Sequence, residues 1–180
     1  MTRIFYFIAL WACLSSCASS FTPFTEDLYR KAGWTESELS RIQFWLSDDI
    51  VLRRVFTGNT SEIQRGEIKV IDGRKVEEVI LPKGTPGIFV KSPATNRLAI
   101  SFEDGSDERF LMFGPNPKAG NRFVLLAKDW ERDWGQVTYD GKLYRVSSRS
   151  AYASLLVDLK KIDRTIIDSR TAAGRKVSTP

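Results

Sequence analysis

Residues 136–146 have the sequence QVTYDGKLYRV, and this stretch decides the fold. Apolar and polar residues alternate on either side of Asp140-Gly141, a dipeptide typical of the two-residue turn of a β-hairpin. A second such pair, Asp72-Gly73, separates residues 67–71 from residues 76–81, and both of those segments also alternate. We therefore predict two antiparallel hairpins and a protein built mainly from β-strands.

The alternating pattern continues between and beyond these hairpins, at intervals of roughly ten residues and with glycine in several of the turns. It predicts further strands in residues 50–56, 87–90, 97–102, 109–113 and 122–126. Short strands at this spacing are typical of an antiparallel β-sandwich or a small β-barrel. Residues 153–159 predict a closing strand, and beyond residue 160 the sequence favours no single structure.

One short helix is predicted before the first of these strands. Thr35 and Glu38 have the spacing of a capping box, in which each side chain accepts a hydrogen bond from the other residue's backbone N–H. The helix is expected to end at Ser47-Asp48-Asp49 and to cover an open end or side of a sheet. Its apolar face would comprise Leu39, Ile42, Phe44, Trp45 and Leu46.

Composition excludes several kinds of catalytic site. The chain has no histidine, which removes Ser-His-Asp and Cys-His catalysis and most zinc sites. Glu77 and Glu78 would point to opposite faces of a strand, so they cannot act as a carboxylate pair on one substrate. The sequence contains no glycine-rich phosphate loop and no nucleophile-elbow motif. We therefore predict no catalytic residues, no metal site and no enzyme activity.

The charge balance indicates the kind of surface that the protein would meet. There are 27 Lys and Arg against 22 Asp and Glu, which gives a formal net charge of +5. Such a mild excess favours acidic surfaces, for example phospholipid headgroups or cell-wall polymers. It is too small and too scattered to indicate nucleic-acid binding.

The beginning of the chain has the layout of an export signal. Arg3 precedes the apolar residues 4–14, and the small residues Ser15 and Ser16 stand before Cys17. The run Leu14-Ser15-Ser16-Cys17 resembles the lipobox of bacterial lipoproteins. The resemblance implies that residues 1–16 are removed and that Cys17 becomes a lipid-bearing N-terminus. Two other readings stay open: a buried strand with a core thiol, and ordinary cleavage after Ala18 that releases a secreted protein.

The same resemblance implies a location. Ala18 follows the lipidated cysteine where lipoproteins retained at the inner membrane of enteric bacteria tend to have Asp, which implies an outer-membrane lipoprotein. No acidic cluster follows Cys17, which favours a domain facing the periplasm. We predict a signal peptide in residues 1–16, a lipidated N-terminus and tether in residues 17–31, and a single β-rich domain in residues 32–180.

Two tryptophans are candidate binding residues. Trp130 and Trp134 bracket Glu131-Arg132-Asp133. Exposed together in a loop, they would stack on sugar rings or insert at a lipid interface. The alternative is that both pack inward and cover the rim of a barrel.

The function expected from these observations is non-catalytic. The protein would be a lipid-anchored scaffold or accessory component of a cell-envelope assembly, with envelope proteins and membrane lipid as partners and no cofactor beyond the lipid on Cys17. The alternative is a small β-barrel that binds a lipid or another apolar ligand. Its lining would comprise Phe102, Phe110, Phe113, Phe123 and Tyr139.

Overall fold

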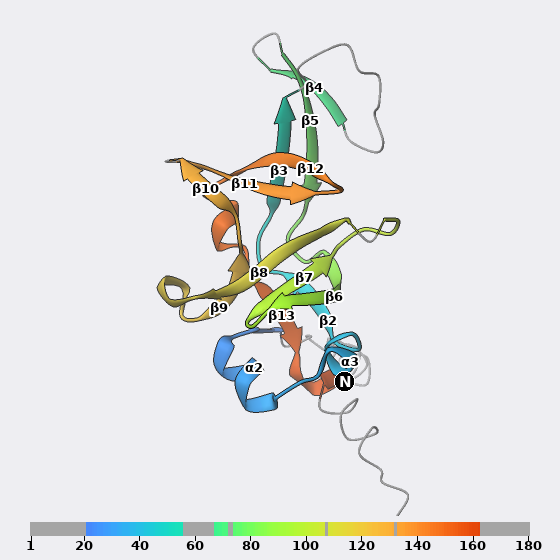
Figure 1. The fold of residues 1–180 in the computed structure, drawn as a ribbon, viewed down its shortest axis with the longest axis vertical. Helices are drawn as coiled ribbons and strands as arrows, with labels where there is room; N and C mark the ends of the chain where they lie inside the picture. Colours follow the sequence, from blue (N-terminus) through green and yellow to red (C-terminus); the bar gives the residue numbers. More distant parts are fainter. Residues whose placement is uncertain (1–20, 56–66, 72–73, 107, 132, 163–180) are drawn as a thin grey trace, which may run out of the picture.

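The computed structural model describes residues 21–55, 67–71, 74–106, 108–131 and 133–162. These residues form two antiparallel sheets, sheet A and sheet B, with a few short helices (Figure 1). Neither sheet closes on itself, so the arrangement is an open sandwich rather than a barrel. The predicted class, mainly β and antiparallel, is confirmed.

Sheet A has the strand order β1-β13-β2-β6-β7-β8-β9. Its last strand in sequence, β13, lies between β1 and β2, so the two ends of the described chain meet in one sheet. The bounds are β1 Phe21–Pro23, β13 Leu155–Asp158, β2 Gln43–Leu46, β6 Pro86–Ala94, β7 Arg97–Ser101, β8 Phe110–Asn116 and β9 Arg122–Leu125.

Sheet B has the strand order β10-β11-β12-β3-β5-β4. In Figure 1 it lies toward one end of the long axis, while β13 and the two α-helices lie toward the other end. The bounds are β10 Lys128–Glu131, β11 Trp134–Tyr139, β12 Lys142–Ser147, β3 Ile50–Val55, β5 Arg74–Leu81 and β4 Glu67–Ile71. The helices are α2 Glu26–Ala32, α3 Glu36–Leu39, η1 Pro117–Ala119 and η2 Ser150–Tyr152.

Both predicted hairpins are present. Asp140 and Gly141 have φ values of 51° and 68°, the positive pair that a tight turn between twisted strands requires. The turn sets the register of β11 and β12, in which Tyr139 pairs with Lys142. The strands β4 and β5 pair in the same antiparallel way, while their connection at residues 72–73 lies outside the described residues.

The core lies between the sheets and takes side chains from both. Its largest fully buried members include Phe44 and Phe113 from sheet A and Leu52 from sheet B. Four of the five residues predicted to line a barrel lumen belong to this packed core, namely Phe102, Phe113, Phe123 and Tyr139. Phe110 instead is half-buried beneath the Lys91 ammonium, which lies 4.7 Å from the ring centroid.

The tether predicted to reach residue 31 is wrong for residues 21–31. Phe21–Pro23 pairs with β13 as an edge strand, and α2 follows at once. Phe24 is fully buried and packs its ring against those of Trp34, Phe44 and Phe123. Thr25 has a local structural role here, because its side chain accepts a hydrogen bond from the backbone N–H of Leu28 and caps α2.

The predicted short helix exists, but it ends much earlier than expected. The capping box of Thr35 and Glu38 is present, and α3 ends at Leu39. The expected continuation is instead β2, in which Phe44 and Leu46 are buried and Trp45 between them is only half-buried. This segment is a central strand that pairs with β13 on one side and β6 on the other, so its backbone N–H and C=O groups form hydrogen bonds on both sides. That pairing overrides the helix-like apolar pattern of the segment.

At the C-terminal end, the predicted closing strand is confirmed as β13, and residues 159–162 continue it with one helical turn. β10 was not predicted. Within the part of the chain that the structure describes, no helix is both long and apolar enough to cross a membrane.

Candidate functional site

Cys17, the predicted lipidation site, lies outside the described residues. The two candidate tryptophans do not lie in a loop. Trp130 belongs to β10 and Trp134 begins β11, and the two strands form a hairpin in which Glu131 pairs with Trp134. Both indoles are partly exposed. The indole of Trp130 packs on Gly135, where an added Cβ atom would lie 3.0 Å from the ring.

An open cleft of about 570 Å³ lies next to this hairpin, between the β8–η1–β9 region and η2. Trp130 and Tyr152 both line it, together with Pro115 and Pro117. Trp134 is not one of the lining residues, so the structure does not bring the two tryptophans together on this surface. The cleft contains one lysine, Lys118, and lacks a cluster of charged groups.

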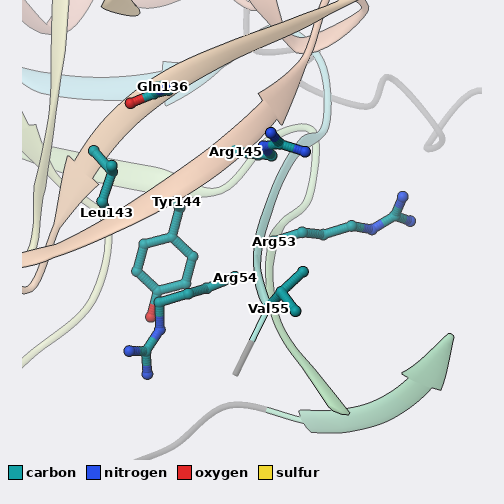
Figure 2. Close-up of a pocket in the computed structure, with 7 residues that line it drawn as sticks. All are labelled: Arg53, Arg54, Val55, Gln136, Leu143, Tyr144 and Arg145. Atoms are coloured by element: carbon teal, nitrogen blue, oxygen red, sulfur yellow. The ribbon is translucent and has the colours of Figure 1, made fainter. Parts of the chain in front are cut away.

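A second groove, which the sequence did not reveal, lies between β3 and β12 (Figure 2). These strands pair through only two residue pairs, Arg53 with Arg145 and Leu52 with Val146, and then part. The opening has a volume of about 410 Å³. We call it the arginine groove, and its lining residues are Arg53, Arg54, Val55, Gln136, Leu143, Tyr144 and Arg145.

One side of the arginine groove is held by a buried ion pair. The guanidinium of Arg54 donates two hydrogen bonds to Oε2 of Glu77, at 2.6 and 3.0 Å, and Glu77 is only 1% exposed. The Arg54 guanidinium also lies 5.8 Å from the centroid of the Tyr144 ring. Burial, and next the charge of Glu77, raise the pKa of Tyr144 to about 12, so its hydroxyl stays neutral at ordinary pH.

The other side of the groove presents two arginines to solvent. Arg53 forms a 2.7 Å ion pair with Glu78. Arg145 stands directly opposite Arg53 across the two strands, and its exposed side chain has no ion pair within the described residues. Like charges at directly opposed positions destabilise a sheet. Glu78 already offsets the charge of Arg53, so the Arg145 guanidinium is the group that a bound anion would neutralise, and guanidinium groups suit carboxylate or phosphate.

The walls of the groove are also partly apolar. Leu143 is 58% exposed and Val55 is 41% exposed, and both line the opening. The site therefore combines cationic donors with apolar contact area, which suits an anionic chain that also carries apolar groups.

The prediction that Glu77 and Glu78 point to opposite faces is confirmed, because each carboxylate binds a different arginine. The sequence signal for the groove was present in the run Arg53-Arg54 and its acidic counterpart Glu77-Glu78. Locating the groove needed the strand order, which places β12 with Arg145 beside β3.

A further polar cluster supports the turn between β11 and β12. Nε of Arg109 lies 3.3 Å from Oδ1 of Asp140, and the Tyr139 hydroxyl donates a 2.7 Å hydrogen bond to Glu103. The hydrogen bond with Asp140 raises the pKa of Arg109, and burial raises the pKa of Tyr139. Every member has a partner inside the cluster, so we assign it a structural role.

The described residues contain no group of three or more His, Cys, Asp or Glu side chains placed to hold a metal ion. The arginine groove is thus the candidate site with the clearest chemistry. No protein-family model matches this chain, and neither a curated protein nor a solved structure matches it.

Proposed function

We propose that this protein is a lipid-anchored, non-catalytic component of a bacterial outer membrane, with its domain in the periplasm. Its role is to hold an acidic segment of another envelope protein in the arginine groove. The lipobox-like run ending at Cys17 supports the anchor. Arg53 and Arg145, paired residues of β3 and β12 that both line a groove with apolar walls, are the single observation that supports the binding role.

The chemistry of the groove favours binding over catalysis. Arginine side chains remain charged at any physiological pH, so they attract and orient an anion but are poor at exchanging protons with it. Tyr144, the other ionisable group in the lining, keeps its proton because its pKa is raised to about 12. The groove therefore supports recognition of charge and shape.

The alternative, an apolar ligand inside a barrel, has less support. Four of the five aromatic residues that would line the lumen pack in the core, and the two sheets are open. We therefore place the binding site on the outside of the molecule.

The anchor is tested by intact mass of the mature protein purified from membranes. We expect cleavage before Cys17, acyl chains on the mature protein, and their loss in a Cys17→Ala variant. A mature protein that begins after Ala18, or that carries no acyl chain, would contradict the lipoprotein assignment.

The groove is tested with a synthetic peptide in which glutamate alternates with leucine. We expect binding that weakens as salt is raised, and at least a tenfold loss of affinity in Arg145→Glu, about 1.4 kcal/mol. The control is Arg97→Glu, the same charge reversal at an exposed arginine of β7, which belongs to sheet A and does not line the groove. Equal loss in the two variants would show that only net charge matters and would end the groove assignment.

A further inference from the structure

The outer face of sheet A, the one turned away from sheet B, carries an apolar strip across four neighbouring strands. Phe21 of β1 is 42% exposed and packs against Trp45 of β2, with 4.7 Å between the ring centroids and 50° between the ring planes. Ile88 of β6 is 57% exposed. The strip follows from the register of the sheet, and its members are Phe21, Pro23, Trp45, Pro86, Ile88 and Leu156.

The register places these residues on one face. Leu156 of β13 pairs with Pro23 on one side and with Trp45 on the other, and Trp45 in turn pairs with Pro86. Side chains of directly paired residues point to the same side of a sheet. The neighbouring residues Phe44 and Val157 point inward and are fully buried.

The position of the proposed acyl anchor indicates that this strip lies near the bilayer surface. Cys17 precedes Phe21 by four residues, and a fully extended chain of that length spans at most about 14 Å. A lipid on Cys17 therefore keeps β1 next to the bilayer surface. The edge of sheet A, which begins with Phe21, cannot move far from the headgroups.

The composition of the strip also suits a membrane interface. Tryptophan is enriched where a protein meets the headgroup layer, and lysine near such a surface places its ammonium toward the headgroups. Lys161 supplies such an ammonium beside the strip, since its Nζ lies 5.6 Å from the centroid of the Trp45 ring.

We infer that the apolar strip on sheet A lies against the phospholipid surface to which the protein is anchored. This inference rests on the proposed lipidation of Cys17. It gives the domain one orientation, with the outer face of sheet A on the membrane. Sheet B, which carries the arginine groove, then points away from the membrane toward partners.

The test uses the full-length lipidated protein in vesicles of phosphatidylethanolamine and phosphatidylglycerol that contain a lipid with a nitroxide on its headgroup. One cysteine is introduced in each variant, Ile88→Cys on the strip or Leu143→Cys in the groove, and carries a polarity-sensitive fluorophore. The two positions are matched, because Ile88 is 57% and Leu143 is 58% exposed. After signal removal and lipidation of Cys17, the introduced cysteine is the one free thiol.

We expect severalfold stronger nitroxide quenching at position 88 than at position 143. Phe21→Glu should weaken the quenching at position 88, since a carboxylate is repelled by anionic headgroups, whereas Gln136→Glu in the groove should leave it unchanged. Equal quenching at both positions, in protein that still floats with the vesicles, would overturn the orientation but leave the anchor intact.

Other outcomes are separable. If the fluorophore at position 88 reported an apolar environment without vesicles, and its emission did not change when vesicles were added, the inference would be overturned. Residues 163–180 or a second copy of the chain would then be what covers the strip. Loss of flotation together with a mass that lacks acyl chains would instead overturn the proposed lipid anchor.

Discussion

Glu77 and Glu78 are neighbours in β5, yet their surroundings differ. Glu77 is 1% exposed and binds Arg54, whose side chain is only 26% exposed. Removing one partner of a buried pair leaves the other charge uncompensated. We therefore expect Glu77→Ala to lower the free energy of unfolding by about 3 kcal/mol, measured by urea denaturation.

Glu78→Ala is the matched comparison. Its partner Arg53 has a side chain that is 42% exposed, so water can hydrate the guanidinium after the carboxylate is lost. We expect a smaller loss, about 1 kcal/mol. Equal losses in the two variants would show that burial of the arginine does not set the cost.

Tyr139 and Tyr144 predict how stability depends on pH. In the unfolded chain both hydroxyls ionise near pH 10, whereas in the folded protein burial raises both pKa values, that of Tyr144 to about 12. Between these values the folded state binds more protons than the unfolded state, so stability falls as pH rises from about 10 to 12. Below pH 9 these two groups add no pH dependence.

The measurement is urea denaturation at a series of pH values from 8 to 11.5, with Tyr144→Phe as the comparison. Phenylalanine keeps the ring and removes the ionisable group. We expect the variant to lose less stability than the wild type over the alkaline range. If the free energy of unfolding fell equally with pH in the two proteins, the raised pKa of Tyr144 would be contradicted.

At the scale of elements, β1 and α2 belong to the folded domain. Substitution of Phe24, which lies between them, tests this most directly. Its side chain is fully buried against four other aromatic rings. Phe24→Ala should lower the free energy of unfolding by about 3–5 kcal/mol, measured by chemical denaturation. Phe21→Ala, at an exposed position of β1, should cost much less. If neither change affected stability, residues 21–31 would be a tether after all.

The elements also show what local sequence can predict. The hairpin at Asp140-Gly141 was predictable because the turn residues and the alternation of both strands are contiguous. Strand β2 was not, because Phe44, Trp45 and Leu46 are three successive apolar residues that fit a helix face as well as a strand. Its pairing with β13 and β6 decides the outcome, and those partners are distant in sequence.

The candidate site, like the strands, was predictable from sequence only where its residues are close together in the chain. Alternation shows that Arg53 and Arg145 each point to the outside of a strand, but not that the two strands are neighbours. The groove requires β3 and β12 to be neighbours, which the strand order of sheet B provides, and it opens where their pairing stops after two residue pairs. The tryptophan pair was found from sequence because its members are close together, yet Trp130 lines the cleft beside η2 and Trp134 does not.

At the scale of the whole molecule, the two sheets share one core, which includes Phe44 and Leu98 from sheet A and Val137 and Val146 from sheet B. We therefore expect one cooperative unfolding transition. Tryptophan fluorescence and far-ultraviolet circular dichroism should report the same midpoint in urea. Two separated transitions would show that the sheets are independently stable.

The position of β13 between β1 and β2 has a consequence for the timing of folding. Phe21 pairs with Asp158, so β1 cannot join its sheet until β13, the last described strand, is available. A chain emerging from its N-terminus cannot complete sheet A until nearly its whole length is free, and such long-range pairing is slow. The sheet order thus delays the completion of sheet A until β13, near the C-terminal end of the described chain, is available to pair with β1 and β2.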